Sequence, residues 1–327
     1  NLIYLLGFNK QAGGTSTGGV NGAFQMFGTS DQRYHIRGGN DQLPKAIASS
    51  LQTPVKTGYK MTSIAQLDDG TYSLKFAVGG TVQTVVADLV ILTIPFAVLR
   101  NLDYSKAGFD ALKNTAIQNL GRGLNGKLQL QFNSRYWSNT GKWLGTSDGL
   151  SYTDVGYQNT WEVTRGQAGA TGILVDYTGG SVTAAMKTLA PWTTAADANT
   201  TKDSNQFLTL LEKVLPGGKA QWNGKATSSL PHLDPNLQTS YSYFRKGQYT
   251  QFGGYERVRQ GNVFFAGEHC STDYQGYMEG GATEGARAAE EIITQLGNLA
   301  SNKKKSQRAP ASVKETVKKK KSVDHTK

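Results

Sequence analysis

The chain has 327 residues, 38% of them hydrophobic, which is enough to bury one large core or two smaller ones. Its formal net charge is +11, but the segment from Lys303 to Lys327 carries +8 of it, so the rest is close to neutral and does not indicate a nucleic-acid-binding body. The single cysteine, Cys270, excludes an intramolecular disulfide, and the sequence has no apolar run of about 18 residues that could span a bilayer.

The first residues of the chain are interpreted as lying part-way through a domain of a longer protein. Residue 1 is not Met and has no basic leader, and glycine pairs among Ser and Thr make residues 1–35 an expected exposed loop. Asn40 can then cap a helix that has Pro44 in its first turn. The apolar face of this helix consists of Leu43, Ile47 and Leu51. The compartment stays open, because any export signal would precede Asn1.

Short strands separated by turns follow this helix. The predicted strands are Met61 to Leu67, Tyr72 to Val78 and Val82 to Val86, with turns at Asp68-Asp-Gly70 and Gly79-Gly80. This pattern indicates an antiparallel ribbon. The run from Asp88 to Pro95 is apolar throughout, as a strand buried on both faces would be, and Pro95 ends it.

Helices and strands alternate through the rest of the chain. A helix is expected from about Gly108 to Leu120, and Lys127 to Phe132 alternates polar and apolar residues as a half-buried strand does. Asp203 is expected to cap a helix that carries Phe207, Leu210, Leu211 and Val214. A buried strand, a helix from about Tyr277 to Leu296 and a Lys-rich tail without periodicity complete the pattern.

The segment Gly121-Arg-Gly-Leu-Asn-Gly126 fits the dinucleotide-binding pattern G-x-G-x-x-G, but its context is reversed. That fingerprint needs a strand before it and a helix after it, so that the helix N-terminus meets the pyrophosphate. Here a helix precedes and a strand follows. The segment is therefore interpreted as a helix C-cap with a turn.

The stretch from Asn262 to Ala289 carries the strongest chemical signal. It combines a buried strand, a loop bearing Glu268 and a helix start rich in small residues, which exposes N–H groups at a positive helix end. A reduced flavin carries negative charge that such an end stabilises, and glycines would let the backbone approach a flat ring. These glycines are Gly276, Gly280 and Gly281. An ordinary strand-loop-helix unit packed by small residues is the alternative.

This stretch, which reads Asn262-Val-Phe-Phe-Ala-Gly-Glu-His-Cys-Ser-Thr-Asp-Tyr-Gln-Gly-Tyr-Met-Glu-Gly-Gly, closely resembles the C-terminal FAD motif of the flavin-containing amine oxidases. That superfamily comprises monoamine, polyamine and L-amino-acid oxidases. The resemblance extends more weakly back to Gly38-Gly39 and covers roughly residues 30 to 296. It implies that Val55 contacts the adenine side of FAD and that Glu268 approaches the ribityl chain. The other implied cofactor contacts are Thr93, Pro95, Gly267, Gly276, Tyr277, Met278 and Glu279.

The resemblance also implies a catalytic role for Lys127. In this family a strand lysine, followed by an alternating run and an aromatic-Trp pair, holds a water at flavin N5, and here Tyr136-Trp137 supplies that pair. The alternative is a lysine on a solvated strand face, since Gln129 and Gln131 share its side.

Tyr277 matches an aromatic residue that stands before the flavin and orients the substrate amine. Monoamine oxidases pair it with a second Tyr that follows a cysteine bonded to the flavin, whereas this chain has Thr239-Ser240, so the FAD is expected to be non-covalent. The second ring is missing unless Tyr241 or Tyr243 leans in, which leaves Ser240 as the substrate-side residue. Tyr177 falls where L-amino-acid oxidases place a tyrosine near the substrate carboxylate, and a core tyrosine is the alternative.

The four histidines are scattered without a partner motif, so no metal site is expected. Glu268 and His269 could form an acid–base pair, although adjacent residues on an extended loop point opposite ways. The Lys-rich tail could bind polyanions, but it lacks an aromatic residue to stack a base, which favours a solubilising extension.

These observations predict an α/β, two-domain FAD-dependent oxidoreductase. A glutathione-reductase-like FAD domain, lacking its N-terminal part, is expected over residues 36–100 and 236–297, and a mixed-sheet substrate domain over 101–235. Residues 1–35 would be a loop region of the substrate domain, and residues 298–327 a disordered tail.

The resemblance implies hydride transfer from a C–H bond next to an amine to flavin N5, giving an imine and, with molecular oxygen, hydrogen peroxide. The expected substrate is a small-molecule amine, and an L-α-amino acid is the alternative. A homodimer stays open; no specific nucleic acid or membrane span is expected. A rival of another class is a catalytically silent fragment or a binding subunit.

Overall fold

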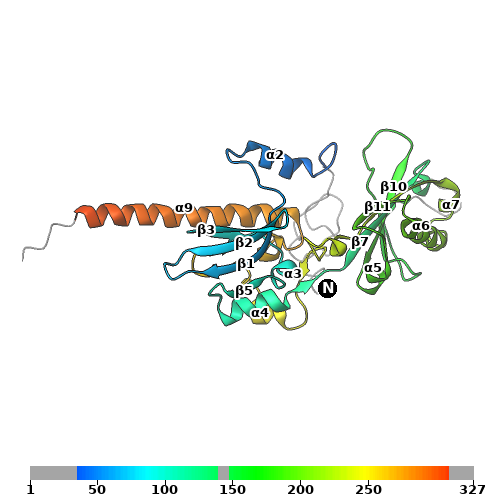
Figure 1. The fold of residues 1–327 in the computed structure, drawn as a ribbon. Helices are drawn as coiled ribbons and strands as arrows, with labels where there is room; N and C mark the ends of the chain where they lie inside the picture. The colour runs from blue at the N-terminus through cyan, green and yellow to red at the C-terminus, as the bar shows by residue number, and fades with distance from the viewer. Residues whose placement is uncertain (1–34, 139–146, 309–327) are drawn as a thin grey trace, which may run out of the picture.

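The computed structural model of the protein describes residues 35–138 and 147–308, and it is an α/β structure with mixed sheets. The predicted glycine-rich loop and the last part of the Lys-rich tail lie outside the described residues. Figure 1 shows the two larger sheets on opposite sides of the molecule, each with helices packed beside it.

The first of these sheets confirms the predicted antiparallel ribbon. Its strands are β1 (Lys60–Gln66), β2 (Tyr72–Val78), β3 (Thr81–Ala87) and β5 (Asp103–Lys106), in the order β3-β2-β1-β5. The ribbon strands pair antiparallel through turns at Gly70 and Gly79-Gly80, and all three glycines have positive φ. Strand β5, which no sequence signal predicted, adds parallel to β1.

Helix α2 (Gln42–Ser50) forms where the periodicity predicted it, but the predicted cap is wrong. Asp41 stands at the N-cap without a side-chain capping bond, and the Asn40 side chain instead accepts a hydrogen bond from the Ile36 backbone N–H. The apolar face predicted for the helix does exist, yet it is exposed: Leu43, Ile47 and Leu51 are 46%, 55% and 51% exposed.

A parallel pair of short strands lies beside the ribbon. Strand β4 (Val90–Leu92) pairs with β14 (Val263–Phe265), and helix α3 (Phe96–Leu99) follows β4. All of β14 is buried, but Ile91 in β4 is 41% exposed. The expectation that β4 is buried on both faces is therefore wrong at Ile91, whose face is left uncovered by the described part of the chain.

Helix α4 (Ala111–Asn119) begins at Asp110, whose carboxylate accepts a hydrogen bond from the Lys113 N–H at 2.7 Å. The glycine pattern at 121–126 lies between a helix and a strand, as predicted. However, Gly121 does not cap the helix; it begins β6 (Gly121–Arg122), which pairs with β13 (Ser242–Tyr243). Helix α8 (Gln248–Phe252) follows β13.

The second large sheet has six antiparallel strands, ordered β11-β12-β7-β10-β9-β8. They are β7 (Asn125–Phe132), β8 (Ser151–Tyr152), β9 (Asn159–Glu162), β10 (Gly172–Gly179), β11 (Trp192–Thr194) and β12 (Trp222–Ser229). Central strand β7 buries Leu128, Leu130 and Phe132, which confirms the predicted alternation. Two short 3-10 helices flank this region, η1 (Tyr136–Ser138) and η2 (Pro231–Leu233).

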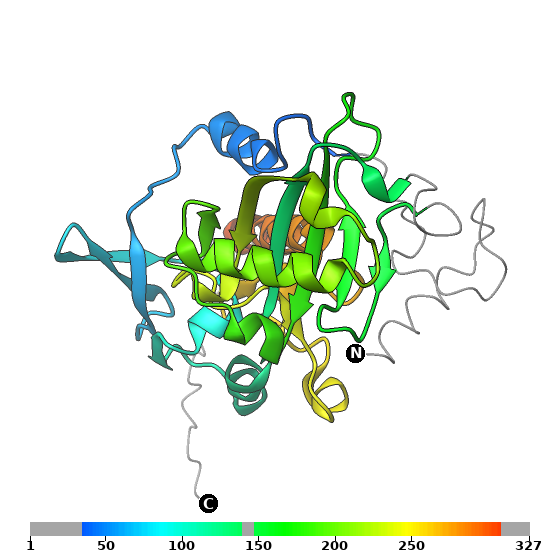
Figure 2. The same cartoon turned by 90° about the vertical axis from the view of Figure 1, so that its right-hand side faces the viewer.

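Figure 2 shows helix α6 in front of this sheet. The helices here are α5 (Ser181–Ala185), α6 (Ala198–Leu211) and α7 (Gly218–Gln221). The side chain of Asp197 caps α6 by accepting a hydrogen bond from the Thr200 N–H at 2.9 Å. The predicted cap, Asp203, is wrong, because it lies inside the helix. The first turn is rich in Thr and carries no apolar periodicity, so the pattern predicted a start that is too late.

The C-terminal segment forms η3 (Glu268–Cys270) and then the long helix α9 (Met278–Arg308). The predicted helix start is confirmed within one residue. The helix continues to Arg308, so the prediction of a structureless tail is wrong for residues 298–308. The apolar periodicity ends earlier than the helix, which explains the early predicted end. None of the helices in the described part of the chain combines the length and the apolar composition needed to cross a membrane.

Two large hydrophobic clusters form the interior. One contains side chains of β1, β2, β4, α3, α4 and β14, and the other is built on β7, β10 and α6. Leu120 packs in the first cluster and Leu128 in the second, so the packing changes between them. The predicted domain boundaries at residues 35, 100, 235 and 297 stay predictions.

Candidate functional site

The start of helix α9 lies between the two larger sheets (Figure 1). Tyr277 and Met278 at this tip are 38% and 59% exposed. Gly280 is buried in the first turn, where an added Cβ would come within 2.3 Å of the Tyr274 carbonyl oxygen, so only glycine fits there. The positive end of the helix dipole therefore faces an open surface in the described part of the chain.

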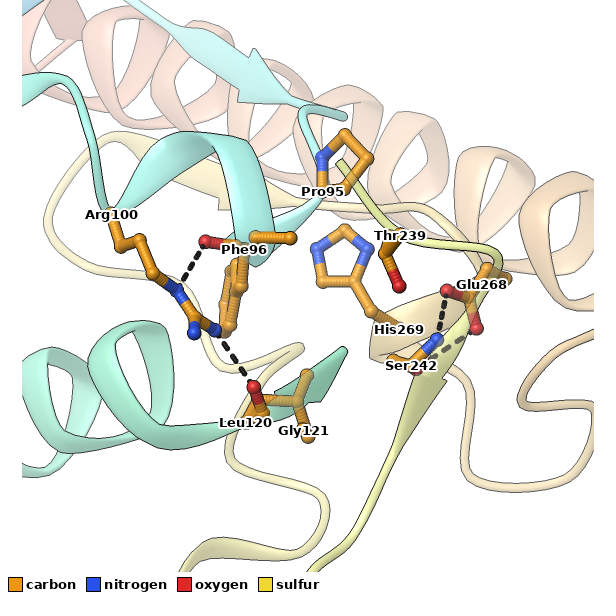
Figure 3. Close-up of a pocket in the computed structure, with 10 residues that line it drawn as sticks. Pro95, Phe96, Arg100, Leu120, Gly121, Thr239, Ser242, Glu268 and His269 are labelled. Carbon is orange, nitrogen blue, oxygen red and sulfur yellow. Dashed lines mark hydrogen bonds between the residues drawn. The ribbon is translucent and has the colours of Figure 1, made fainter. Parts of the chain in front are cut away.

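Glu268 links this tip to β13. Its carboxylate accepts hydrogen bonds from the Ser242 N–H at 2.9 Å, the Ser242 hydroxyl at 2.9 Å and the Gly276 N–H at 2.8 Å. Burial raises the pKa of Glu268, and these hydrogen bonds oppose the rise. The preceding Gly267 has a φ of 119°, which positions the carboxylate at the turn out of β14. Figure 3 shows Glu268 directed toward Ser242.

His269 points the other way, toward Phe96, as Figure 3 shows. The centroids of the Phe96 and His269 rings are 4.6 Å apart, and the imidazole Nε2 has no hydrogen-bond partner in the described residues. Burial, and after it the charge of Lys113, lowers the pKa of His269 to about 3, so the ring is neutral near pH 7. Because the two side chains diverge, Glu268 and His269 do not form an acid–base pair.

Several aromatic side chains form a row beside the helix tip. The hydroxyl groups of Tyr177 and Tyr241 are hydrogen-bonded at 2.9 Å, and the Tyr177 ring lies 5.2 Å from that of Trp161. An added Cβ at Gly276 would contact the Tyr241 ring at 3.5 Å, so the Tyr241 ring lies against the loop before the helix. Burial, and after it the neighbouring Tyr241 hydroxyl, raises the pKa of Tyr277.

Lys127 belongs to the same group. It lies opposite Tyr177 in the β7–β10 ladder, and its Nζ is 5.9 Å from the centre of the Trp161 ring. The side chain is exposed, although desolvation by the surrounding protein lowers the pKa of its ammonium group. Gln129 and Gln131 share its side of β7, but they hydrogen-bond to β12 side chains. Lys127 is thus exposed on the same side of β7 as the two glutamines, and the catalytic role and the solvated strand face both stay predictions.

The residues before Tyr241 are held by hydrogen bonds. The Ser240 hydroxyl donates to the Asn125 side-chain oxygen at 3.1 Å, and the Thr239 hydroxyl donates to the Tyr241 carbonyl at 2.9 Å. Cys270, the chain's single cysteine, is buried beneath the loop. Neither Thr239 nor Ser240 offers a thiol for a flavin bond.

Thr93, Pro95 and Val55, the other residues predicted to contact the cofactor, lie on different segments of the chain. Thr93 places its carbonyl oxygen 3.5 Å from where a Gly267 Cβ would be, so these two backbones are adjacent. Pro95 begins α3 and lines a small pocket with the residues drawn in Figure 3, namely Phe96, Ala97, Arg100, Leu120, Gly121, Thr239, Ser242, Glu268 and His269. Val55 is 57% exposed in the segment between α2 and β1. Within residues 35–138 and 147–308, no three His, Cys, Asp or Glu side chains gather as metal ligands would.

Comparison with known proteins decides the family. The family model described as flavin containing amine oxidoreductase matches residues 2–293. The chain belongs to this family. YobN of Bacillus subtilis (strain 168), whose name provisionally assigns it L-amino-acid oxidase activity, is 28% identical over 82% of this chain and 54% of its own length. Polyamine oxidase 5 of Oryza sativa subsp. japonica is 29% identical over 82% of this chain and 52% of its own length.

Solved structures of the same kind share the fold. Putrescine oxidase, solved as the wild type bound to putrescine, superposes with a TM-score of 0.63 at 18% identity, covering 79% of this chain and 53% of that chain. The amine oxidoreductase chain described here thus spans about half the length of the relatives that it matches.

Two residues of the candidate site were missed or left open from sequence. The Trp161 ring approaches both Lys127 and Tyr177 because β9 and β7 both flank β10 in the six-stranded sheet. Tyr241 approaches Tyr177 across 64 residues of sequence. Such contacts arise from strand order, which a local pattern does not reveal.

Proposed function

We propose that this chain is the flavin- and substrate-facing part of an FAD-dependent amine oxidase. The observation that carries the proposal is the meeting of the exposed α9 tip with Tyr277, Tyr241, Tyr177 and Lys127. A positive helix end, a row of rings and an ammonium group are what a reaction between an amine and a flat, electron-accepting ring requires.

The residues present are suited to FAD. The Glu268 carboxylate, held by Ser242 and Gly276, could accept a hydrogen bond from a sugar-like hydroxyl group, while Tyr277 to Glu279 form the exposed edge against which a ring would lie. Thr93, Pro95 and Val55 would contact the remainder of the cofactor. When bound non-covalently, FAD would accept a hydride at N5 and pass two electrons to molecular oxygen, which becomes hydrogen peroxide.

The tyrosines would orient the substrate. Tyr277 and Tyr241 would face the substrate amine, and the Tyr177–Tyr241 hydrogen bond would hold the second ring in place. Lys127 would donate a hydrogen bond to a water beside the flavin. Loss of a hydride from the carbon next to nitrogen leaves an iminium ion, which releases a proton and hydrolyses to a carbonyl compound and the free amine or ammonia.

A small-molecule amine is the substrate class that we favour, because the described cluster is built from neutral rings and one ammonium group. An L-α-amino acid is the second candidate. It is favoured by the similarity to YobN and by Tyr177, which would then lie near the substrate carboxylate. Lys127 is the cation in this cluster that such a carboxylate could meet.

The described residues contain no strand followed by G-x-G-x-x-G and a helix, the unit that holds a pyrophosphate. We therefore expect this chain by itself to bind FAD weakly. The proposal concerns the protein together with a polypeptide that supplies such a unit, and a catalytically silent fragment is the competing interpretation.

Peroxide release by the parent and by two variants tests the proposal. Peroxide release by the longest product of the gene, loaded with FAD, is measured across polyamines, monoamines and L-amino acids. We expect turnover of at least one amine, a loss of at least tenfold in Lys127→Met, and no change in Lys225→Met, which removes an exposed lysine from β12. An FAD-loaded protein that turns over none of these substrates would overturn the proposal, as would undiminished activity in Lys127→Met.

A further inference from the structure

Three arginine side chains belong to the segments that meet where β6 pairs with β13. Arg100 is half-buried; its Nε donates to the Phe96 carbonyl at 3.0 Å and its Nη2 to the Leu120 carbonyl at 2.8 Å (Figure 3). The guanidinium group is thereby fixed against the backbone that leads into β6.

The strand pairing brings the other two arginines to the same place. Arg122 lies opposite Ser242 in the β6–β13 register, and Arg245 follows β13 by two residues. The Gln248 side chain donates to the Asn119 carbonyl and accepts from the Arg245 N–H, so this segment folds back on residues 119–122. Arg122 and Arg245 are both exposed.

The group carries positive charge that the described residues do not balance. Burial, and after it the charges of Arg122 and Arg245, lowers the pKa of Arg100, so both exposed arginines act on the half-buried one. His232 is also nearby: burial first, and then Lys187 and Arg122, lower its pKa, and its Nδ1 has no hydrogen-bond partner in the described residues.

Arginines elsewhere in the chain are neutralised. The ion pairs are Arg135–Glu162, Arg165–Asp148, Arg257–Glu284, Arg287–Glu284 and Arg287–Glu291. Within residues 35–138 and 147–308, neither an ion pair nor a hydrogen bond forms at the guanidinium of Arg122 or Arg245. Lys246, next to Arg245, adds another exposed cation.

We propose that Arg100, Arg122 and Arg245 form a binding site for a phosphate group, either as inorganic phosphate or as a phosphomonoester. Arg122 and Arg245 each present a planar fork of N–H donors that matches two oxygens of a phosphate, and Arg100 adds the Nη1 donors that its two backbone contacts leave. A phosphate dianion would reduce the repulsion that Arg100 meets from the other two cations. A carboxylate could meet one fork, but its single charge would leave the three cations at a net +2, whereas a phosphate dianion leaves them at +1. The inference does not depend on the oxidase proposal, because it requires neither FAD nor an amine.

The test is calorimetric titration of the full chain at constant ionic strength, with chloride as the reference anion. Inorganic phosphate and glycerol phosphate are the two probes, since their comparison separates the free ion from the ester. We expect saturable binding of one phosphate per chain, weakened about tenfold or more in Arg122→Gln and in Arg245→Gln, as the loss of a charge-assisted hydrogen bond predicts. Arg122→Lys should recover part of the affinity, because it keeps the charge and loses the fork.

Lys225→Gln is the matched control, because it removes an exposed positive charge from β12 without touching this site, and it should bind phosphate like the parent chain. Circular dichroism verifies that each variant is folded. Three results would overturn the inference: no saturable phosphate binding, equal weakening in Lys225→Gln, or competition between phosphate and FAD, which would assign the cluster to the cofactor site.

Discussion

Asp176 is a carboxyl group in the middle of β10 that is only 6% exposed, and its Oδ1 has no hydrogen-bond partner in the described residues. Burial, and after it the charge of Asp203 on α6, raises the pKa of Asp176 from 3.8 to about 7. Ionising a carboxyl group that is buried without hydrogen-bond partners costs free energy. Between the two pKa values the folded protein therefore keeps a proton on Asp176 that the unfolded chain releases.

The sign and size of the effect follow from linkage. Because the folded pKa is raised, the favourable contribution is complete below pH 3.8 and is lost as the pH rises to about 7. A shift of roughly three pKa units at 1.36 kcal/mol each amounts to about 4 kcal/mol. That is a large part of the roughly 5–15 kcal/mol by which domains are stable, so Asp176 should lower stability measurably at pH 8.

We predict that Asp176→Asn removes this pH dependence. The assay is urea unfolding followed by tryptophan fluorescence at several values between pH 4 and pH 8. The difference in unfolding free energy between variant and parent should grow in favour of the variant by up to about 1.4 kcal/mol per pH unit. Glu256, whose pKa burial also raises to about 7, titrates in both proteins and cancels in the difference. Burying the Asn amide can add a free-energy cost that does not depend on pH. Such a cost changes the stability difference equally at every pH and leaves its slope against pH unchanged.

Asp154→Asn is the control, because Asp154 is exposed in the same region. The stability difference from the parent should rise more steeply with pH in Asp176→Asn than in this control. A constant difference for Asp176→Asn would refute the reasoning, since it would mean that Asp176 is solvated or paired in solution and ionises as an ordinary carboxyl group.

Three further outcomes are expected at the candidate site. Tyr241→Phe removes the hydrogen bond to Tyr177 and should lower the unfolding free energy by about 1 kcal/mol, with a rise in KM for the amine; urea unfolding and steady-state kinetics measure the two effects. Glu268→Gln replaces a carboxylate that accepts three hydrogen bonds and should cost about 1–3 kcal/mol, read as a fall in Tm. Lys127→Met should leave FAD content unchanged while slowing flavin bleaching by substrate at least tenfold in stopped-flow experiments. A loss of FAD from Lys127→Met as large as its loss of bleaching rate would contradict the role proposed for Lys127.

Secondary structure was predictable from sequence where the residues of one short segment are enough to determine it. The alternation from Lys127 to Phe132 and the glycine turns of the ribbon determine strands without help from elsewhere, and both predictions are confirmed. The start of α9 is confirmed for the same reason, since small residues after Tyr277 permit a tight first turn.

Predictions failed where two nearby residues could each play the same structural part, or where a segment distant in the sequence determines the structure. Asp197 and Asp203 are both capable helix caps, and the choice fell to Asp197 because its carboxylate also accepts a hydrogen bond from the Leu189 N–H, eight residues away. Strand β5 pairs with β1 although β2, β3, β4 and α3 lie between them in the sequence, and the four residues of β5 do not reveal this partner.

The contact between Tyr177 and Tyr241 has a consequence beyond holding one ring. Tyr177 belongs to the six-stranded sheet, whereas Tyr241 immediately precedes β13, whose Ser242 donates two hydrogen bonds to Glu268. Glu268 in turn accepts a hydrogen bond from the loop before α9. A shift of β10 against the rest of the molecule would therefore reach the helix tip through three consecutive polar contacts. Substitutions in the second hydrophobic cluster should alter the positions of the Tyr177 and Tyr241 rings before they alter the Glu268 turn.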